Sequence, residues 1–253
     1  MLLDGRNAII YGGGGAIGGA MARAFAREGG HVFLAGRTLA TLDAVAEPIR
    51  KDGGRADTAV VDALDESQVD AHADAVVRAA GRLDISVNVI SDGDVQGTAI
   101  ADMSPADYLS PVDTSVRARF LTSRAAARHM KANGAGVILF FGGQGDPTAH
   151  RRYQVGGLLT GFAAVEAMRR QLAAELGEYG IRVVTLRTGG VPEVIPEGSE
   201  FRARIEADMT KQSLLGRVAT LADVGNVALF AVSDLARTLT GTAINMSCGA
   251  ILD

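Results

Sequence analysis

Tryptophan is absent from this sequence of 253 residues, and there is one cysteine, Cys248. A single thiol cannot form an internal disulfide, so we expect a reducing compartment such as the cytoplasm. No apolar run approaches the roughly 20 residues of a membrane-spanning helix, and the first residues lack the pattern of a signal peptide. Lysine and arginine (25) are fewer than aspartate and glutamate (29) and form no basic stripe. We therefore expect a small-molecule ligand, and neither nucleic acid nor a membrane, as the partner.

What the sequence does have is a regular alternation of short apolar runs and longer amphipathic ones. Its hydrophobic share of 47% suits one large core, and no linker or repeat divides it, so we expect one domain over residues 1–253. Strands are predicted at 7–11, 31–35, 56–61, 85–90, 137–141, 181–186 and 243–246. A first helix is predicted to end near residue 27, and others at 39–51, 66–80, 106–131, 158–179 and 222–233, with Thr38 as a candidate N-cap. This order predicts an α/β fold, a Rossmann-like doubly wound parallel sheet with helices on both faces.

A glycine cluster, Gly12 to Gly15, separates the first predicted strand from the first helix. Glycines in this place let the backbone approach a pyrophosphate, and the helix N-terminus offers its free amides to the charge. The cluster therefore predicts a bound nucleotide at the carboxyl ends of the strands.

The segment 11–18 resembles the TGxxxGIG loop of the classical short-chain dehydrogenases/reductases, with Tyr11 at the threonine and Ala16 at the second glycine. Further landmarks follow in the family's order along nearly the whole chain: 61–62, 83–91 for LDxLVNNAG, 180–183 for GIRVN, 188–191 for the turn near the nicotinamide, 216–217, 221–224 and 240–241. The resemblance implies an NAD(P)-dependent oxidoreductase. It implies cofactor contacts at Gly12, Gly14, Gly15, Ile17, Gly18, Arg37, Thr38, Asp62, Ala63, Asn88, Gly189 and Val191.

The end of the second predicted strand bears on the choice of cofactor. Relatives that prefer NAD carry an acidic residue there, which binds the ribose hydroxyls, whereas this chain has Gly36 followed by Arg37. A guanidinium can pair with a 2′-phosphate through two hydrogen bonds. We therefore expect NADP(H) in preference to NAD(H).

The resemblance also implies four working residues. A serine orients the substrate carbonyl, a tyrosine transfers the proton, a lysine lowers the pKa of that tyrosine and holds the nicotinamide ribose, and an asparagine anchors a relay water. In this chain Ser115 falls at the asparagine, Gly143 at the serine, Leu158 at the tyrosine and Phe162 at the lysine. Since leucine, phenylalanine and glycine cannot transfer a proton, we expect the family's usual mechanism to be absent.

The register of the last two positions depends on three landmarks that follow one another without a gap, 162–165, 172–176 and 180–182. Tyr153 is a near miss, because making it the family's tyrosine would need five extra residues inside a helix, more than one turn. His150 or Tyr153 could still supply a replacement proton donor, and Arg151 or Arg152 could hold an anionic substrate.

A pair of carboxylates, Asp92 and Asp94, follows the fourth predicted strand. No histidine or third acid lies nearby in the sequence, so we interpret the segment as a turn and expect no metal.

Three functions are compatible with these residues. The first is an atypical NADP(H)-dependent oxidoreductase acting on an unknown carbonyl or alcohol. The second is a catalytically lapsed relative that binds NADP(H) or a metabolite as a sensor or partner subunit, and the third is a non-redox lyase or isomerase on the same fold. Members of the family usually pair through the helices predicted at 106–131 and 158–179, and the second carries the small residues Ala163, Ala164, Ala167 and Ala174. We therefore expect a homodimer or homotetramer.

Overall fold

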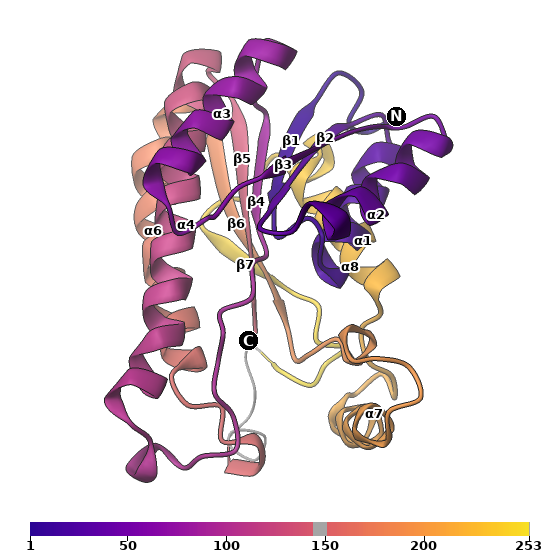
Figure 1. Cartoon of the computed structure of the whole chain (residues 1–253), viewed down its shortest axis with the longest axis vertical. Coiled ribbons are helices and arrows are strands. Elements are labelled where there is room, and N and C mark those ends of the chain that lie inside the picture. The colour runs from indigo at the N-terminus through magenta and orange to yellow at the C-terminus, as the bar shows by residue number, and fades with distance from the viewer. Residues whose placement is uncertain (144–150, 253) are drawn as a thin grey trace.

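The computed structural model describes residues 1–143 and 151–252. Its centre is a seven-stranded sheet in the order β3-β2-β1-β4-β5-β6-β7, in which all neighbours run parallel (Figure 1). The strands are β1 (Asn7–Tyr11), β2 (His31–Gly36), β3 (Arg55–Val60), β4 (Ile85–Asn88), β5 (Gly136–Gly143), β6 (Ile181–Thr188) and β7 (Thr242–Asn245). The order reverses between β1 and β4, and ligands of such sheets bind outside the strand ends at that point.

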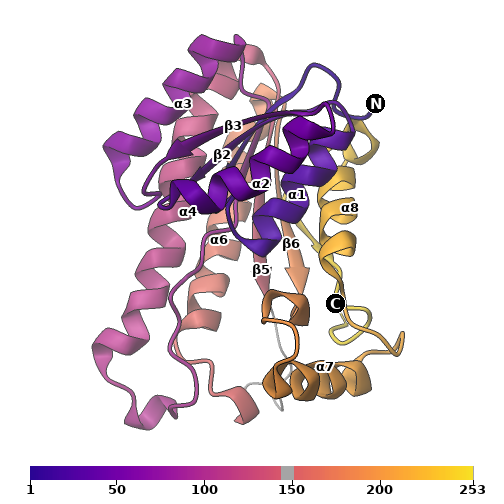
Figure 2. The same ribbon diagram turned by 45° about the vertical axis from the view of Figure 1, so that its right-hand side comes forward.

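Helices cover both faces of the sheet (Figures 1 and 2). The helices are α1 (Ala16–Arg27), α2 (Leu39–Lys51), α3 (Glu66–Ala80), α4 (Pro105–Asn133), α6 (Leu158–Leu176), α7 (Glu200–Gln212) and α8 (Leu221–Val232), with short 3-10 turns η1 (Ile100–Asp102), η2 (Gly177–Tyr179), η3 (Pro192–Val194) and η4 (Asp234–Ala236). On one face α1 packs against α8, and on the other α4 packs against α6. Among the described residues, no helix has both the length and the apolar character to cross a bilayer.

The side chains of β1 show how the sequence builds a core on each face. Ala8 and Ile10 point into the cluster formed with α1, α2 and α8, whereas Ile9 and Tyr11 point into the cluster formed with α3, α4 and α6. All four are at most 1% exposed. Because successive strand residues face opposite sides, an unbroken apolar run is what a strand covered on both faces requires.

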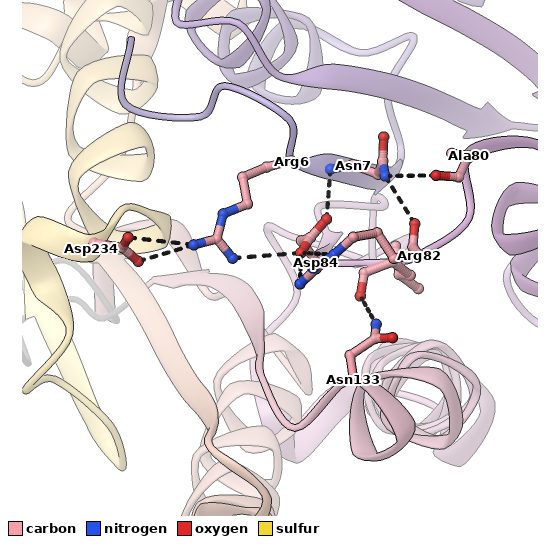
Figure 3. Close-up of polar contacts among 8 residues, drawn as sticks. Arg6, Asn7, Ala80, Arg82, Asp84, Asn133 and Asp234 are labelled. Carbon is pink, nitrogen blue, oxygen red and sulfur yellow. Dashed lines mark hydrogen bonds and ion pairs between the residues drawn. The ribbon is translucent and has the colours of Figure 1, made fainter.

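Asp84 joins β1 to β4 at the amino-terminal edge of the sheet (Figure 3). Its carboxylate accepts a hydrogen bond from the Asn7 amide over 2.9 Å and pairs with Arg82 over 2.6 Å and Arg6 over 3.5 Å. Arg6 extends the network to Asp234, 3.3 Å away. This edge is opposite the one at which ligands of such sheets bind, so the network serves to hold the strands together.

The predicted α/β fold is confirmed, with every predicted strand and helix present and their ends shifted by a few residues. The fourth strand ends at Asn88 rather than at residue 90, and the helix predicted to reach 179 ends at Leu176 and continues as η2. Thr38 occupies the N-cap of α2, but its side chain makes no capping hydrogen bond. Helix α7 was not predicted, because its sequence is mostly polar and carries little apolar periodicity.

Candidate functional site

A cavity of about 1020 Å³ opens at the carboxyl ends of the strands, outside the point where the strand order reverses. Following the strand order, its wall begins at the ends of β3 and β2, passes the glycine loop after β1, and continues past the ends of β4, β5 and β6. The start of α6 and part of α7 complete the wall. Helix α7 lies beyond the carboxyl end of β6, where it covers this side of the sheet (Figure 2).

The glycine loop fits a pyrophosphate. Gly12, Gly14, Gly15, Ile17 and Gly18 all line the cavity. A side chain at Gly18 would collide with the carbonyl oxygen of Gly12, so the loop and the first turn of α1 can approach one another this closely only with glycine. Gly15 is the N-cap of α1 and provides no side-chain cap, so the first amides of the helix remain available to an anion.

The cavity wall at the ends of β2 and β3 contains Arg37, Thr38, Asp62 and Ala63. Arg37 is exposed and makes no ion pair or hydrogen bond with any residue of the described ranges, so its guanidinium is available to a ligand. Asp62 is held in place because its Oδ1 accepts a hydrogen bond from the Leu64 amide over 3.0 Å. This end of the cavity therefore offers a free cation beside a fixed carboxylate.

Asn88 lies behind the cavity wall. It is 1% exposed, and its side-chain amide donates to Thr122 Oγ1 over 3.2 Å and accepts from the Ile90 amide over 3.4 Å. The side chain thus shapes the end of β4, and it is the following residues, Val89 to Ser91, that line the cavity. Of the residues after β6, Gly189 and Val191 line the cavity as expected from the sequence.

Three of the four positions that the sequence comparison predicts for the family's working residues lie on the cavity wall, and they are apolar. Gly143, Leu158 and Phe162 line the cavity, and a Cβ at Gly143 would lie 3.3 Å from the Phe162 ring. Ser115 is fully buried behind this surface, with 0% exposure. These three residues give this part of the cavity wall an apolar surface.

The sequence predicted a turn at Asp92 but not that its side chain is buried in an ion pair. Asp92 is 7% exposed, and its Oδ1 accepts hydrogen bonds from Ser115 Oγ over 2.5 Å and from Arg119 Nη1 over 2.7 Å. Arg119 is 1% exposed and also donates to the carbonyl oxygens of Ser115, over 3.2 Å, and Phe141, over 3.1 Å. Its guanidinium lies 6.0 Å from the centroid of the Phe162 ring. Both charged residues line the cavity.

Arg119 is a functional-site residue that the sequence analysis did not identify, because a charged residue on a long helix usually faces water. The spacing did contain a signal, since Ser115, Arg119 and Thr122 recur at intervals of four and three and so share one face of α4. That face is the buried one, because Ala118, Thr122 and Ala126 on it are at most 2% exposed.

Tyr153 lines the same cavity, whereas His150 lies outside the described residues. The Tyr153 hydroxyl is buried and makes no hydrogen bond of good geometry with a described residue. Arg152, next to it, pairs with Asp208 of α7 over 2.6 Å. Asp208 raises the pKa of Arg152, with smaller contributions from Tyr153, so a cation stands beside the phenol. Within the described ranges no group of three or more metal-ligating side chains occurs.

The chain matches a family model described as Enoyl-(Acyl carrier protein) reductase over residues 14–250. It is 29% identical to 7alpha-hydroxysteroid dehydrogenase of Escherichia coli, over 98% of this chain and 95% of that one. It is 30% identical to 3alpha-hydroxysteroid dehydrogenase of Mediterraneibacter gnavus, over 99% of this chain and 98% of that one.

The fold agrees with solved structures of the same kind. A structure of 7 alpha-hydroxysteroid dehydrogenase complexed with NADH and 7-oxo glycochenodeoxycholic acid superimposes with a TM-score of 0.85 at 28% identity, covering 99% of this chain and 96% of that one. A short-chain type dehydrogenase/reductase from Mycobacterium marinum gives a TM-score of 0.85 at 27% identity, covering 99% and 97%. With its parallel sheet, its glycine loop and these matches over nearly its whole length, the chain belongs to the short-chain dehydrogenase/reductase family of oxidoreductases.

Proposed function

We propose that this protein is an NADP(H)-dependent oxidoreductase that interconverts a carbonyl and an alcohol without the family's serine, tyrosine, lysine and asparagine. The observation that carries the proposal is one cavity lined by the glycine loop, by Arg37 and by the ends of β4 and β6. Family membership implies NAD(P)(H) as the cofactor, which supplies or accepts the hydride when bound.

Different residues of this cavity would contact different parts of the cofactor. The uncapped N-terminus of α1 and the loop around Gly14 and Gly15 would hold the pyrophosphate. Asp62 and Ala63 of the cavity wall would border the adenine, and Gly189 and Val191 would border the nicotinamide. Phe162 provides no hydrogen bond to the nicotinamide ribose, so the affinity depends more heavily on the phosphates.

The preference for NADP(H) rests on Arg37. The related 7 alpha-hydroxysteroid dehydrogenase was solved with NADH. Here Gly36 presents no carboxylate to the adenosine ribose, and Arg37 beside it has no partner within the described residues. A 2′-phosphate is the group that would use such a guanidinium.

The substrate end of the cavity favours an apolar carbonyl or secondary alcohol. Its wall there carries Leu158, Leu159, Phe162, Val194 and Met209. Several relatives are named hydroxysteroid dehydrogenases, which fits a large apolar substrate. Tyr153 is a candidate replacement proton donor, since its buried hydroxyl is without a hydrogen bond of good geometry and borders the cavity. His150 remains a second candidate.

A catalytically lapsed relative that binds NADP(H) without turnover is the second candidate function. The hydrocarbon surface formed by Gly143, Leu158 and Phe162 supports it, because none of these side chains can donate or accept a proton. The cavity that would hold the cofactor is the same in both cases, so binding alone does not separate them.

We also propose a homodimer or homotetramer formed through α4 and α6. Leu109 and Phe120 on α4 are 56% and 48% exposed, and Ala163, Ala167 and Ala174 on α6 are exposed small residues. An exposed apolar helix face beside small residues suits helix packing between subunits.

The test of the function is a turnover assay with NADPH and NADP⁺ over a panel of ketones and secondary alcohols, including hydroxysteroids and sugar alcohols. Steady turnover of any member supports the oxidoreductase. Saturable NADPH binding with no turnover of any member contradicts it and supports the lapsed relative. Tyr153→Phe then tests the replacement donor, which turnover at the wild-type rate would exclude.

A further inference from the structure

The carboxylate of Asp92 has one oxygen engaged and one available. Oδ1 accepts hydrogen bonds from Ser115 and Arg119, whereas Oδ2 accepts none from any residue in the described ranges. Oδ2 is also not among the fully buried unpartnered atoms, so it keeps accessible surface, and Asp92 lines the cavity. A carboxylate oxygen that is reached from the cavity can exchange a proton with a ligand bound there.

The position of Asp92 puts this oxygen at the reactive end of the cavity. The residue follows β4 by a few positions, at the strand beside which the sheet order reverses. Its contacts come from Ser115 and Arg119 of α4, and Arg119 in turn contacts Phe141 of β5 and faces Phe162 of α6. These are the same elements that carry the family's four working positions.

Arg119 fixes the position of the Asp92 carboxylate. The guanidinium donates to Asp92 Oδ1 and to two backbone carbonyls, and its Nε is buried with no hydrogen-bond partner within the described residues. A buried arginine with an unsatisfied nitrogen is costly, and the ion pair with Asp92 offsets part of that cost. The family resemblance implies a lysine at the position of Phe162 on α6, and phenylalanine carries no charge there. Here the cation comes from α4 instead.

The other titratable side chains on the cavity wall are differently placed. Arg37 and Asp62 lie at the adenosine end, and Tyr11 is 1% exposed at the end of β1. Asp94 and Tyr153 share the reactive end, but Asp94 is already paired with Gln96 over 2.5 Å. Of the groups that face Asp92, α4 presents Arg119 and Ser115, β5 presents a carbonyl, and α6 presents an aromatic ring.

We propose that Asp92 exchanges the proton with the substrate oxygen, and that Arg119 and Ser115 are the positioning residues that hold it. The proposal rests on the oxidoreductase function proposed above. In the oxidation direction the substrate O–H bond breaks and its proton passes to Asp92 Oδ2. The hydrogen of the C–H bond would leave with its electron pair as hydride, which the oxidised cofactor would accept when bound. The carbonyl forms, and Asp92 then releases its proton to water. In the reduction direction the same oxygen returns the proton.

The experiment uses the full-length protein and four variants. They are Asp92→Asn, Arg119→Lys, Tyr153→Phe and, as a matched control, Asp102→Asn, an exposed carboxylate of the same connection between β4 and α4. For each protein we would measure kcat/KM against pH in the oxidation direction, with NADP⁺ and the best alcohol of the panel. We would also measure NADPH affinity through the fluorescence of NADPH, and the melting temperature. The last two readouts separate a loss of chemistry from a loss of binding or folding.

The proposal predicts that Asp92→Asn lowers kcat/KM about 100-fold or more. It also predicts that this variant loses the fall in activity at low pH and keeps near wild-type NADPH affinity, whereas Asp102→Asn matches wild type in kcat/KM, pH profile and NADPH affinity. Arg119→Lys keeps a cation farther from the carboxylate, so the low-pH limb moves to higher pH. Wild-type kcat/KM and an unchanged pH profile in Asp92→Asn would overturn the proposal.

Two further results have a defined meaning. If Asp92→Asn does not fold, Arg119→Lys decides, and an unmoved low-pH limb in that variant overturns the proposal. If wild type binds no NADPH or turns over no substrate, the proposed function itself fails, and the role of Asp92 falls with it. If Asp92→Asn turns over substrate at the wild-type rate but Tyr153→Phe does not, the proposed oxidoreductase function is supported and the proposed role of Asp92 is excluded.

Discussion

The guanidinium of Arg119 lies 2.7 Å from the carboxylate of Asp92, and both side chains are more than nine-tenths buried against the cavity. The pair joins the middle of α4 to the segment after β4. Because both charges are removed from water, each buried ion is stabilised by the opposite charge of its partner.

Arg119→Met should therefore be strongly destabilising. It leaves the Asp92 carboxylate buried without its cation, and breaking a buried pair in this way costs about 3–5 kcal/mol. The measurement is the free energy of unfolding from urea titration. The matched control is Arg117→Met, on the same helix but in an exposed pair with Asp113, where little change is expected. Equal effects of the two substitutions would contradict the prediction.

Arg37→Ala should weaken NADPH binding and leave NADH binding nearly unchanged. A charged hydrogen-bonding contact to a phosphate is worth about 1.5–3 kcal/mol, so the loss in NADPH affinity should be about 10-fold to 100-fold. The measurement is a pair of titrations followed through the fluorescence of the reduced cofactors. Arg78→Ala, an exposed arginine of α3, serves as the control. A parallel loss of NADH affinity would show that Arg37 does not act on the 2′-phosphate.

The buried His72 should make the protein less stable at low pH. Burial lowers the pKa of His72 to about 4 from 6.5, so the unfolded chain takes up a proton at higher pH than the folded protein does. The stabilising effect of the neutral side chain is complete above pH 6.5 and is lost as the pH falls toward 4, by up to about 3 kcal/mol. Unfolding of wild type and His72→Leu should be compared between pH 7.5 and 4.5. Parallel pH curves of the two proteins would refute the assignment.

Phe120→Glu should dissociate the proposed dimer. The ring is exposed on α4, and a carboxylate in its place stays solvated in the monomer but not in an apolar subunit interface. Light scattering coupled to gel filtration gives the mass directly. Val60→Glu, on the exposed edge strand β3, is the control that should keep the wild-type mass. A wild-type protein that is already monomeric would contradict the proposed dimer or tetramer.

Much of the fold was readable from the sequence because its strands are covered on both faces. Strands β1 and β2 and most of β5 are short continuous apolar runs, as in Ile9 and Ile10. Strands and helices also alternate along most of the chain. The glycine loop was readable for a steric reason, since only glycine permits the contact between Gly12 and Gly18. The place of Arg37 on the cavity wall was readable because Arg37 directly follows the second predicted strand.

The ion pair was not readable, because local patterns treat a charge as a residue that faces water. Asp92 lies in a segment rich in turn-forming residues, and Arg119 lies on a helix with several exposed arginines. What buries them is the packing of α4 against α6 and β5, which brings together residues far apart in the chain. Helix α7 was missed for a related reason, since none of its residues is buried and its sequence therefore lacks an apolar face, and Asp208 on it pairs with Arg152 far away in the sequence.

The most direct test of the central claim, a working cofactor cavity without the family's proton-transfer residues, is a titration of the wild-type protein with NADPH and NADH. The chain has no tryptophan, so the fluorescence of the reduced cofactor is the signal to follow. We expect saturable binding of one cofactor per chain, tighter for NADPH than for NADH. An absence of saturable binding, or tighter binding of NADH, would contradict the cavity and Arg37 assignments on which the proposed function rests.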